Sequence, residues 1–200
     1  MTNVDLSVYE TFSYTEYMAR FFAWGEPGEG AKYDLKMQGY IRLNQSRSQR
    51  IAKTLQLQTA LLSRLEAIKD RMVWLVITEP WCGDSAQNLP LLAAVAAVNP
   101  DMLALKIVLR DDYPLLMNNF LTNGAKAIPK MIAFDALLQH ELFMWGPRPM
   151  LAQELLTAWK TDPAGKTWED FEQELHTWYA RDKTMATQTE LIHLLEKVNI

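Results

Sequence analysis

The chain has 200 residues, a formal net charge of −4 at pH 7, and 49% hydrophobic and 22% charged residues. This apolar content is enough to form a folded core, so wholesale disorder is excluded. The slight excess of acidic residues gives no basic footprint for nucleic acid. The sequence holds one cysteine, Cys82, which excludes an internal disulfide and any metal site built from several cysteines.

The N-terminus has no basic start and no long apolar run, and the longest apolar stretch, residues 89–98, contains Pro90 and is too short to cross a bilayer. We therefore expect a cytoplasmic protein without a membrane segment, in which an unpaired thiol stays reduced. The three histidines lie far apart in the sequence without metal-like spacing, which favours solvated or helix-surface positions for His140, His176 and His193. No metal and no cofactor are expected.

Residues 1–70 are predicted to form a helical N-terminal extension packed on the core. Aromatic residues recur at helical spacing over 14–22, and a second helix is expected from about Asn44 to about Asp70. Basic residues lie largely off the apolar stripe of that second helix. These basic residues are Arg47, Arg50, Lys53 and Arg64. They form either a solvated face of the helix or a group that faces an anion or the cysteine.

Residues 71–160 change to alternating strands and helices, which predicts an α/β domain with a parallel strand pair and a helical crossover. The run Met72–Thr78 is continuously apolar and rich in β-branched residues, as in a strand buried on both faces. Further elements are expected as a helix to about 98, a strand over 103–109, a short helix through 120, strands over 131–134 and 139–145, and a helix to about 160.

Residues 161–200 are predicted to form a helical C-terminal extension in two pieces, each with an apolar stripe. We expect both extensions to pack on the outer faces of the sheet, and a dimer surface is the alternative, so the chain is expected to be a monomer or a homodimer. The N-terminal helical segment is also placed where it would overhang the groove beside the cysteine and restrict large substrates.

Cys82 lies between the buried strand and the first turn of a helix. The free N–H groups and the positive end of the helix dipole stabilise a thiolate at such a position. Ser85 brings a hydroxyl near the sulfur, whereas Asp84 opposes a second negative charge. The alternative is an inert buried cysteine.

The segment Trp81-Cys82-Gly83-Asp84-Ser85 resembles the thioredoxin active site, Trp-Cys-Gly-Pro-Cys, at the same strand-to-helix position. Pro90 resembles the proline of the family's active-site helix, Ile128-Pro129 its Ile–cis-Pro pair, and Gly146 the glycine after its next strand. The stretch Glu79–Pro90, together with Trp145–Pro149, is similar to a bacterial thioredoxin-like family whose members often lack the second active-site cysteine. The resemblance implies a thioredoxin-like α/β fold over 71–160, a central mixed sheet of about four to five strands flanked by helices.

Two departures from the family pattern agree with each other. Ser85 stands where thioredoxins have the resolving cysteine, and Val76 stands where they have a buried aspartate that assists that cysteine. A mixed disulfide on Cys82 therefore needs an outside thiol, such as glutathione or another small thiol, as co-substrate.

The resemblance implies Cys82 and Ser85 as catalytic residues. It implies a substrate-binding group around them: Trp81, Gly83, Asp84, Ile128, Pro129 and Lys130. Lys130 is expected either to approach Cys82 and favour its thiolate or to be a surface lysine, and Trp81 to be either a platform for a bound peptide or a half-buried aromatic.

Three functions fit these residues. The first is a monothiol thiol–disulfide oxidoreductase acting on protein or small-molecule thiols and disulfides. The second is a non-catalytic thioredoxin-fold module that binds a peptide or protein, and the third is a peroxide-sensing thiol that cycles through sulfenic acid. Neither nucleic acid nor membrane is expected as a partner.

Overall fold

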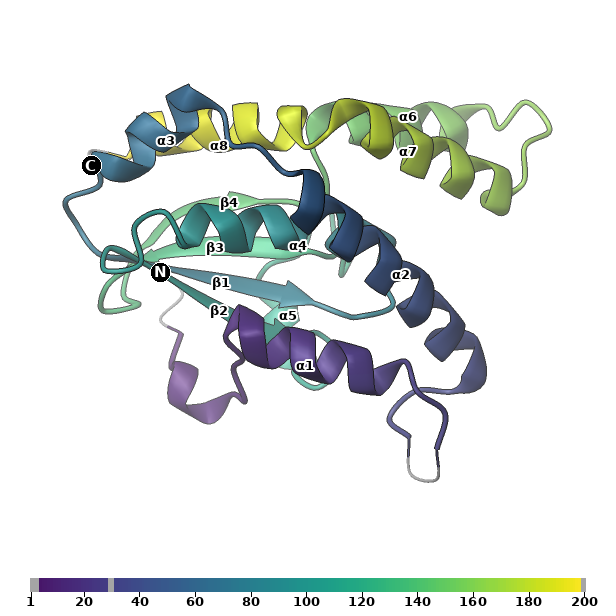
Figure 1. The fold of residues 1–200 in the computed structure, drawn as a ribbon, viewed down its shortest axis with the longest axis horizontal. Coiled ribbons are helices and arrows are strands. Elements are labelled where there is room, and N and C mark those ends of the chain that lie inside the picture. Colours follow the sequence, from purple (N-terminus) through teal and green to yellow (C-terminus); the bar gives the residue numbers. More distant parts are fainter. Residues whose placement is uncertain (1–3, 29–30, 199–200) are drawn as a thin grey trace.

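A four-stranded mixed sheet forms the centre of the protein, seen in a computed structural model that describes residues 4–28 and 31–198 (Figure 1). The strands are β1 (Met72–Thr78), β2 (Leu103–Leu109), β3 (Lys130–Asp135) and β4 (Glu141–Trp145), in the order β2-β1-β3-β4. β1 pairs in parallel with β2 and antiparallel with β3, and β3 pairs antiparallel with β4. The predicted mixed sheet with flanking helices is confirmed.

The helices surround this sheet and extend beyond it. Both ends of the chain fall partly outside the described residues, since 1–3 of the N-terminal extension and 199–200 of the C-terminal extension are not described. The described helical elements are a short 3-10 helix (Leu6–Val8), α1 (Tyr14–Trp24), α2 (Leu35–Thr54), α3 (Thr59–Glu66), α4 (Gly83–Ala96), α5 (Pro114–Asn118), α6 (Met150–Thr161), α7 (Trp168–Asp182) and α8 (Met185–Lys197).

The two faces of the sheet are covered by different elements, because successive side chains of a strand point to opposite faces. Trp74 and Val76 belong to a core shared with α1, α3, α4 and α8. Leu75 and Ile77 belong to a second core with α5 and the N-terminal segment around Val4. All four strand residues are fully buried, as the continuous apolar run predicts.

The predicted helix over 44–70 is wrong in its start and its continuity. α2 already begins after Asp34, whose side chain accepts a hydrogen bond from the N–H of Met37, as an N-cap does. The chain then leaves the helix at Leu55, which adopts an extended conformation. The amide of Gln188 on α8 binds both sides of the break, accepting from Gln58 N and donating to the carbonyl of Gln56, so a distant helix fixes the interruption.

The C-terminal helices divide between the sheet and a separate cluster. α8 packs beside α3, while α6 and α7 form a hairpin that projects beyond the sheet at the upper right of Figure 1. Phe171, Leu175 and Tyr179 on α7 form a small core of their own with Ala152 and Leu156 on α6. The N-terminus of α7 is closed by a capping box between Thr167 and Asp170.

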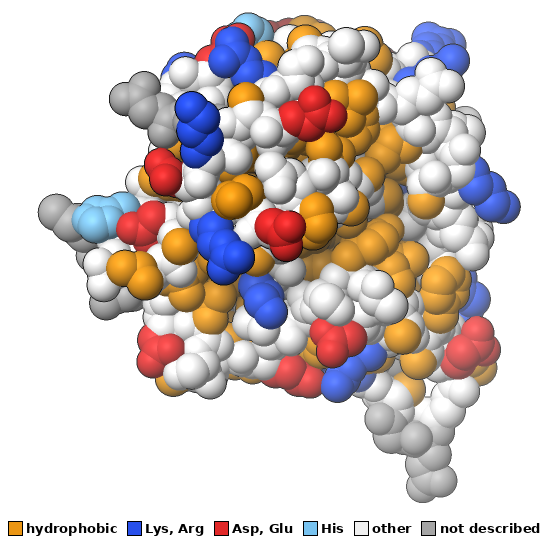
Figure 2. Space-filling model, turned by 60° about the vertical axis from the view of Figure 1, so that its left-hand side comes forward, with side chains coloured by type: hydrophobic (Ala, Val, Ile, Leu, Met, Phe, Trp, Pro, Cys, Tyr) orange, Lys and Arg blue, Asp and Glu red, His pale blue; other side chains and the backbone are white. Residues whose placement is uncertain are grey.

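The surface on the side of α1 and α4 is mixed in character. Figure 2 shows hydrophobic side chains gathered in a hollow on this face, with acidic and basic side chains scattered around it rather than collected into a patch of one sign. Among the described residues, no helix combines the length and the apolar character needed to cross a membrane.

Candidate active site

Cys82 is the N-cap residue of α4, directly after the loop that follows β1. Its backbone N–H donates to the carbonyl of Glu79 at 3.1 Å, and its carbonyl accepts from Ala86 N at 3.1 Å, which fixes the turn from strand to helix. The thiol is 9% exposed and donates to the carbonyl oxygen of Ile128, with Sγ and O 3.3 Å apart. The structure thus brings together Cys82 and the Ile128–Pro129 segment, which are 46 residues apart in the sequence.

The thiol of Cys82 is held in its protonated form. Burial raises its pKa to about 11, and the charge of Asp84 acts in the same direction. The hydroxyl and N–H of Ser85 and the N–H of Asp84 lower the pKa, as expected at a helix N-terminus, but they do not outweigh burial. Burial and charge therefore reverse the thiolate preference that the N-cap position alone predicts.

Asp84 is buried in a network made by the C-terminal part of the chain. Its Oδ2 accepts from Nη2 and Nε of Arg148 at 2.5 and 3.1 Å, and its Oδ1 accepts from the hydroxyl of Tyr179 at 2.7 Å. Asn88 donates to the Asp84 carbonyl and to the Tyr179 hydroxyl, and Thr187 donates to Asn88. Burial raises the pKa of Asp84, and its pairing with Arg148 opposes that effect. α7 is thus tied directly to the first turn of α4 through Tyr179, and α8 is tied to the second turn through Thr187.

Helices α7 and α2 also cover Gly83. A β-carbon at Gly83 would lie 2.6 Å from Nε2 of His176 and 3.3 Å from Nη1 of Arg47, so a side chain at this position requires His176 to move. Nδ1 of His176 lies 3.0 Å from Nε2 of Gln87, whose Oε1 accepts from Arg50. Burial and the positive charge of Arg47 lower the pKa of His176 to about 3.

These contacts settle two interpretations made from the sequence. His176 lies on helix α7, as one of the two expected positions states, but it is half-buried and its ring faces the motif. The basic residues of the N-terminal helices divide: Arg47 and Arg50 face the start of α4, whereas Arg64 pairs with Glu196 at 3.0 Å and Lys53 is exposed.

The Ile128–Pro129 and Gly146–Pro147 segments form a corner beside Cys82. Both peptide bonds before these prolines are cis. Gly146 has φ of +107°, and a β-carbon there would lie 2.2 Å from the carbonyl oxygen of Pro129. Glycine is therefore required at this position both by conformation and by the close approach of the two segments.

Lys130 takes neither of the two positions expected for it, whereas Trp81 is half-buried, as one of its two interpretations states. The side chain of Lys130 is buried, with 6% exposed, and its amine donates to Oγ1 of Thr122 rather than to a group around Cys82. Burial lowers the pKa of this amine. Trp81 is half-buried, and the guanidinium of Arg110 lies 4.9 Å from its ring centroid, so the ring is already partly stacked within the protein.

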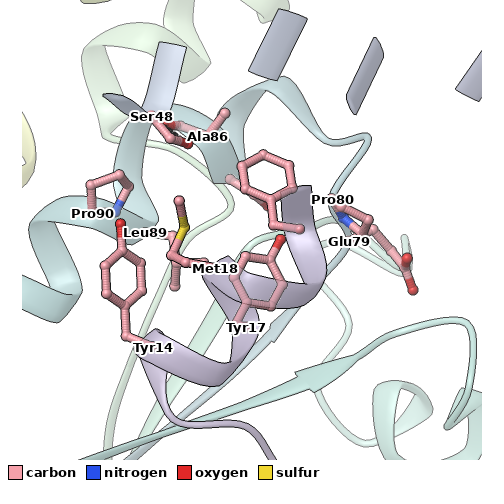
Figure 3. Close-up of a pocket in the computed structure, with 11 residues that line it drawn as sticks. Tyr14, Tyr17, Met18, Ser48, Glu79, Pro80, Ala86, Leu89 and Pro90 are labelled. Carbon is pink, nitrogen blue, oxygen red and sulfur yellow. Dashed lines mark hydrogen bonds between the residues drawn. The ribbon is translucent and has the colours of Figure 1, made fainter. Parts of the chain in front are cut away.

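The space behind the motif is small. A cavity of about 10 Å³ lies where α1 meets α4, with Tyr14, Tyr17 and Met18 on one side and Ser48, Ala86, Leu89 and Pro90 around it (Figure 3). Ser85 also lines it, and its buried hydroxyl forms no hydrogen bond of standard geometry with any residue that the structure describes. A cavity of this size admits no substrate.

Glu79 is a second titratable group near the motif, but its carboxylate points away from this cavity (Figure 3). The two carboxylate oxygens accept from the Tyr33 hydroxyl at 2.9 Å and from Asp111 N at 2.8 Å. Burial raises the pKa of Glu79 to about 6. Within the described residues, no three side chains of His, Cys, Asp or Glu gather as a group able to hold a metal ion.

Sequence reasoning missed the residues that control the motif from outside it. Arg148 and Tyr179 bind Asp84 although they lie 64 and 95 residues after it in the sequence. His176, on the same helix as Tyr179, contacts Gly83. The segment Gly-Pro-Arg-Pro indicated a break in the chain around Arg148 but no partner for its side chain. No local pattern over 168–182 singled out Tyr179.

The comparisons with known proteins agree with this architecture. A thioredoxin family model matches residues 30–160. A protein of unknown function from Pseudomonas aeruginosa, solved as a crystal structure, is 21% identical, with a TM-score of 0.56 over 92% of this chain and 98% of that one. An HIV epitope scaffold is 23% identical, with a TM-score of 0.55 over 94% of this chain and 99% of that one. A comparison with curated proteins found no match. The two structures show a shared fold, and the family model, which spans more than half of the chain, shows that this protein belongs to the thioredoxin family.

Proposed function

We propose that this chain is a thioredoxin-fold module that binds a partner peptide or protein, with Cys82 held as a neutral and covered thiol. The observation that carries the proposal is the state of Cys82, which is 9% exposed and has its pKa raised to about 11 by burial and by Asp84. At pH 7 a thiol with that pKa is ionised in only ~1 of 10,000 molecules, and the thiolate is the nucleophile in disulfide exchange.

Two further features support binding without catalysis. Ser85 lacks a sulfur with which to resolve a mixed disulfide. Asp84 keeps a carboxylate beside the sulfur, and Arg148 and Tyr179 fix it there at hydrogen-bond distance. This arrangement favours a stable first turn of α4 over a reactive thiolate.

Monothiol exchange is the second candidate, because Cys82 keeps the N-cap position at which the N–H groups of Asp84 and Ser85 lower its pKa. In that reaction the Cys82 thiolate would attack a glutathionylated substrate, forming a Cys82–glutathione disulfide and releasing the substrate thiolate. A second glutathione thiolate would then attack the disulfide, giving oxidised glutathione and the Cys82 thiolate. A peroxide-sensing role needs the same thiolate and has no separate support.

The test measures the reactivity of Cys82 directly, because the chain has a single cysteine and alkylation therefore reports that thiol alone. The rate of iodoacetamide alkylation is followed from pH 6 to pH 11 for the folded protein and for the protein unfolded in guanidinium. We expect the folded protein to reach half-maximal rate at a higher pH than the unfolded chain, whose thiol titrates near ~8.5.

Turnover of a glutathione mixed disulfide is measured alongside, with Cys82→Ser as the control. The binding-module proposal predicts no turnover above that control. Turnover that requires Cys82, with a folded-state pKa at or below that of the unfolded chain, would replace the proposal with monothiol exchange. Labelling of Cys82 by a sulfenic-acid probe under mild peroxide, without such turnover, would favour the peroxide-sensing thiol.

A further inference from the structure

A broad groove lies beyond the corner formed by Gly146 and Pro147. It has a volume of about 780 Å³ and runs between the end of β4, one side of α6 along its length, the face of α8 and the turn over 122–127. Its walls include Gly146, Pro147 and Arg148, so the groove is continuous with the segment that packs against Pro129 and holds Asp84. We call it the β4 groove.

The charge of the β4 groove is opposite to that of the whole protein. Lys160 and Lys197 line it, both are exposed, and among the described residues neither forms an ion pair. Glu190 is the acidic residue among the lining residues, and both of its oxygens are engaged, one by Trp145 Nε1 at 2.7 Å and the other by Met150 N at 2.6 Å. The groove is therefore basic, although the chain carries a net charge of −4.

The floor and edge of the groove fit an extended chain. Met144 and Met150 are 39% and 63% exposed, and both line the groove. β4 is the last strand of the sheet, so the backbone groups on its outer side are not paired with any other strand of the described residues. An added peptide strand gains main-chain hydrogen bonds at such an edge, and flexible methionines accommodate varied apolar side chains.

We propose that the β4 groove docks an extended, acidic segment of a partner protein. The segment lies along the outer edge of β4, its apolar side chains contact Met144 and Met150, and its carboxylates face Lys160 and Lys197. This inference rests on the proposed binding function and specifies the class of partner that the module accepts.

The test uses two cysteine-free peptides of ten residues, acetylated and amidated at their ends and labelled with a fluorophore. One alternates Glu and Val, and the other alternates Lys and Val. Binding to the full chain is measured by fluorescence anisotropy at pH 7.4. We expect the acidic peptide to bind at least about tenfold more tightly than the basic one, and its affinity to fall as salt is raised, since exposed charges are screened.

Variants with matched controls locate the binding site. Lys160→Glu and Lys197→Glu are each expected to weaken binding about 3- to 10-fold, and Met144→Glu at least as much. Lys53→Glu on α2 and Met185→Glu, a methionine that is 48% exposed at the start of α8, make the same changes outside the groove and should leave the affinity unchanged.

Three results would overturn the proposal: no saturable binding of the acidic peptide, equal binding of both peptides, or groove variants that behave like their controls. A homodimer in analytical ultracentrifugation that Met144→Glu dissociates would also overturn it, because a second copy would then occupy the groove. None of these results depends on thiol chemistry. Failure of the docking proposal is therefore distinguishable from failure of the proposed function, which Cys82-dependent turnover would reveal.

Discussion

Replacing Asp84 with asparagine tests whether the carboxylate beside Cys82 keeps the thiol neutral. The pKa of Cys82 is raised from an ordinary 9.0 to about 11, which corresponds to about 3 kcal/mol against the thiolate. Burial is the largest cause and the charge of Asp84 the second. If loss of the Asp84 charge lowers the pKa of Cys82 by about half a unit to one unit, the thiolate fraction at neutral pH rises about 3- to 10-fold.

Asp84→Asn also leaves the guanidinium of Arg148 without its counter-charge, and this positive charge acts in the same direction on the thiol. We therefore expect the alkylation rate of Cys82 at pH 7.5 to rise about 3- to 10-fold. The same change should lower the free energy of unfolding by about 2–4 kcal/mol, because a buried ion pair is broken while asparagine can still accept a hydrogen bond from Tyr179.

The matched control is Asp101→Asn, which makes the same change of charge on an exposed residue beyond the far end of α4. Its alkylation rate should equal that of the wild type, and the rate in guanidinium should be the same for all three proteins. A folded Asp84→Asn protein with an unchanged rate would refute the reasoning, since burial alone would then account for the raised pKa of Cys82.

Three further substitutions test the contacts around the motif. The pKa of His176 is lowered to about 3, so below pH ~6.5 the unfolded chain binds a proton at this residue that the folded chain does not bind. The free energy of unfolding should therefore decrease as the pH falls below ~6.5, by about 2 kcal/mol at pH 5. Urea denaturation should show that His176→Gln lacks this decrease. Gly83→Ala should cost about 1–3 kcal/mol by collision with His176, and a double-mutant cycle with His176→Ala should recover most of that cost if the collision is its source. Gly146→Ala should cost more than Gly83→Ala in thermal unfolding, because its new β-carbon meets the backbone oxygen of Pro129 rather than a side chain that can move; an equal or smaller cost would contradict the close approach.

The strands and the motif were predictable because their signals are local. The apolar run over 72–78 and the cysteine at the following turn predict a buried strand followed by the N-terminus of a helix, which the structure has as β1 and α4. The interruption of the helix at residues 55–58 was not predictable. Leu55 and Leu57 continue an apolar pattern, and the group that holds the break, the amide of Gln188, comes from α8 more than 130 residues later.

The raised pKa of the Cys82 thiol was likewise not predictable from the sequence. Its position at a strand-to-helix turn was read correctly, and position alone favours a thiolate. Burial depends on how the Ile128 segment and the neighbouring helices pack, and Tyr179 becomes a partner of Asp84 because α7 returns to α4. Such contacts are decided by tertiary packing and carry no periodic or spacing signal.

The N-terminus of α4 and the groups around Cys82 have opposite effects on the free energy of the Cys82 thiolate. A helix dipole with its N–H groups stabilises a negative charge by about 0.3–1 kcal/mol, and by up to about 2 kcal/mol in partly buried sites. The net pKa of about 11 already includes this stabilisation by the N–H groups of Asp84 and Ser85, so the opposing effects of burial and Asp84 exceed it by about 3 kcal/mol. The thioredoxin-like turn therefore does not by itself decide what the cysteine does in this protein. Packing around the sulfur and the Asp84–Arg148–Tyr179 contacts decide it, and two of those three residues lie outside the motif.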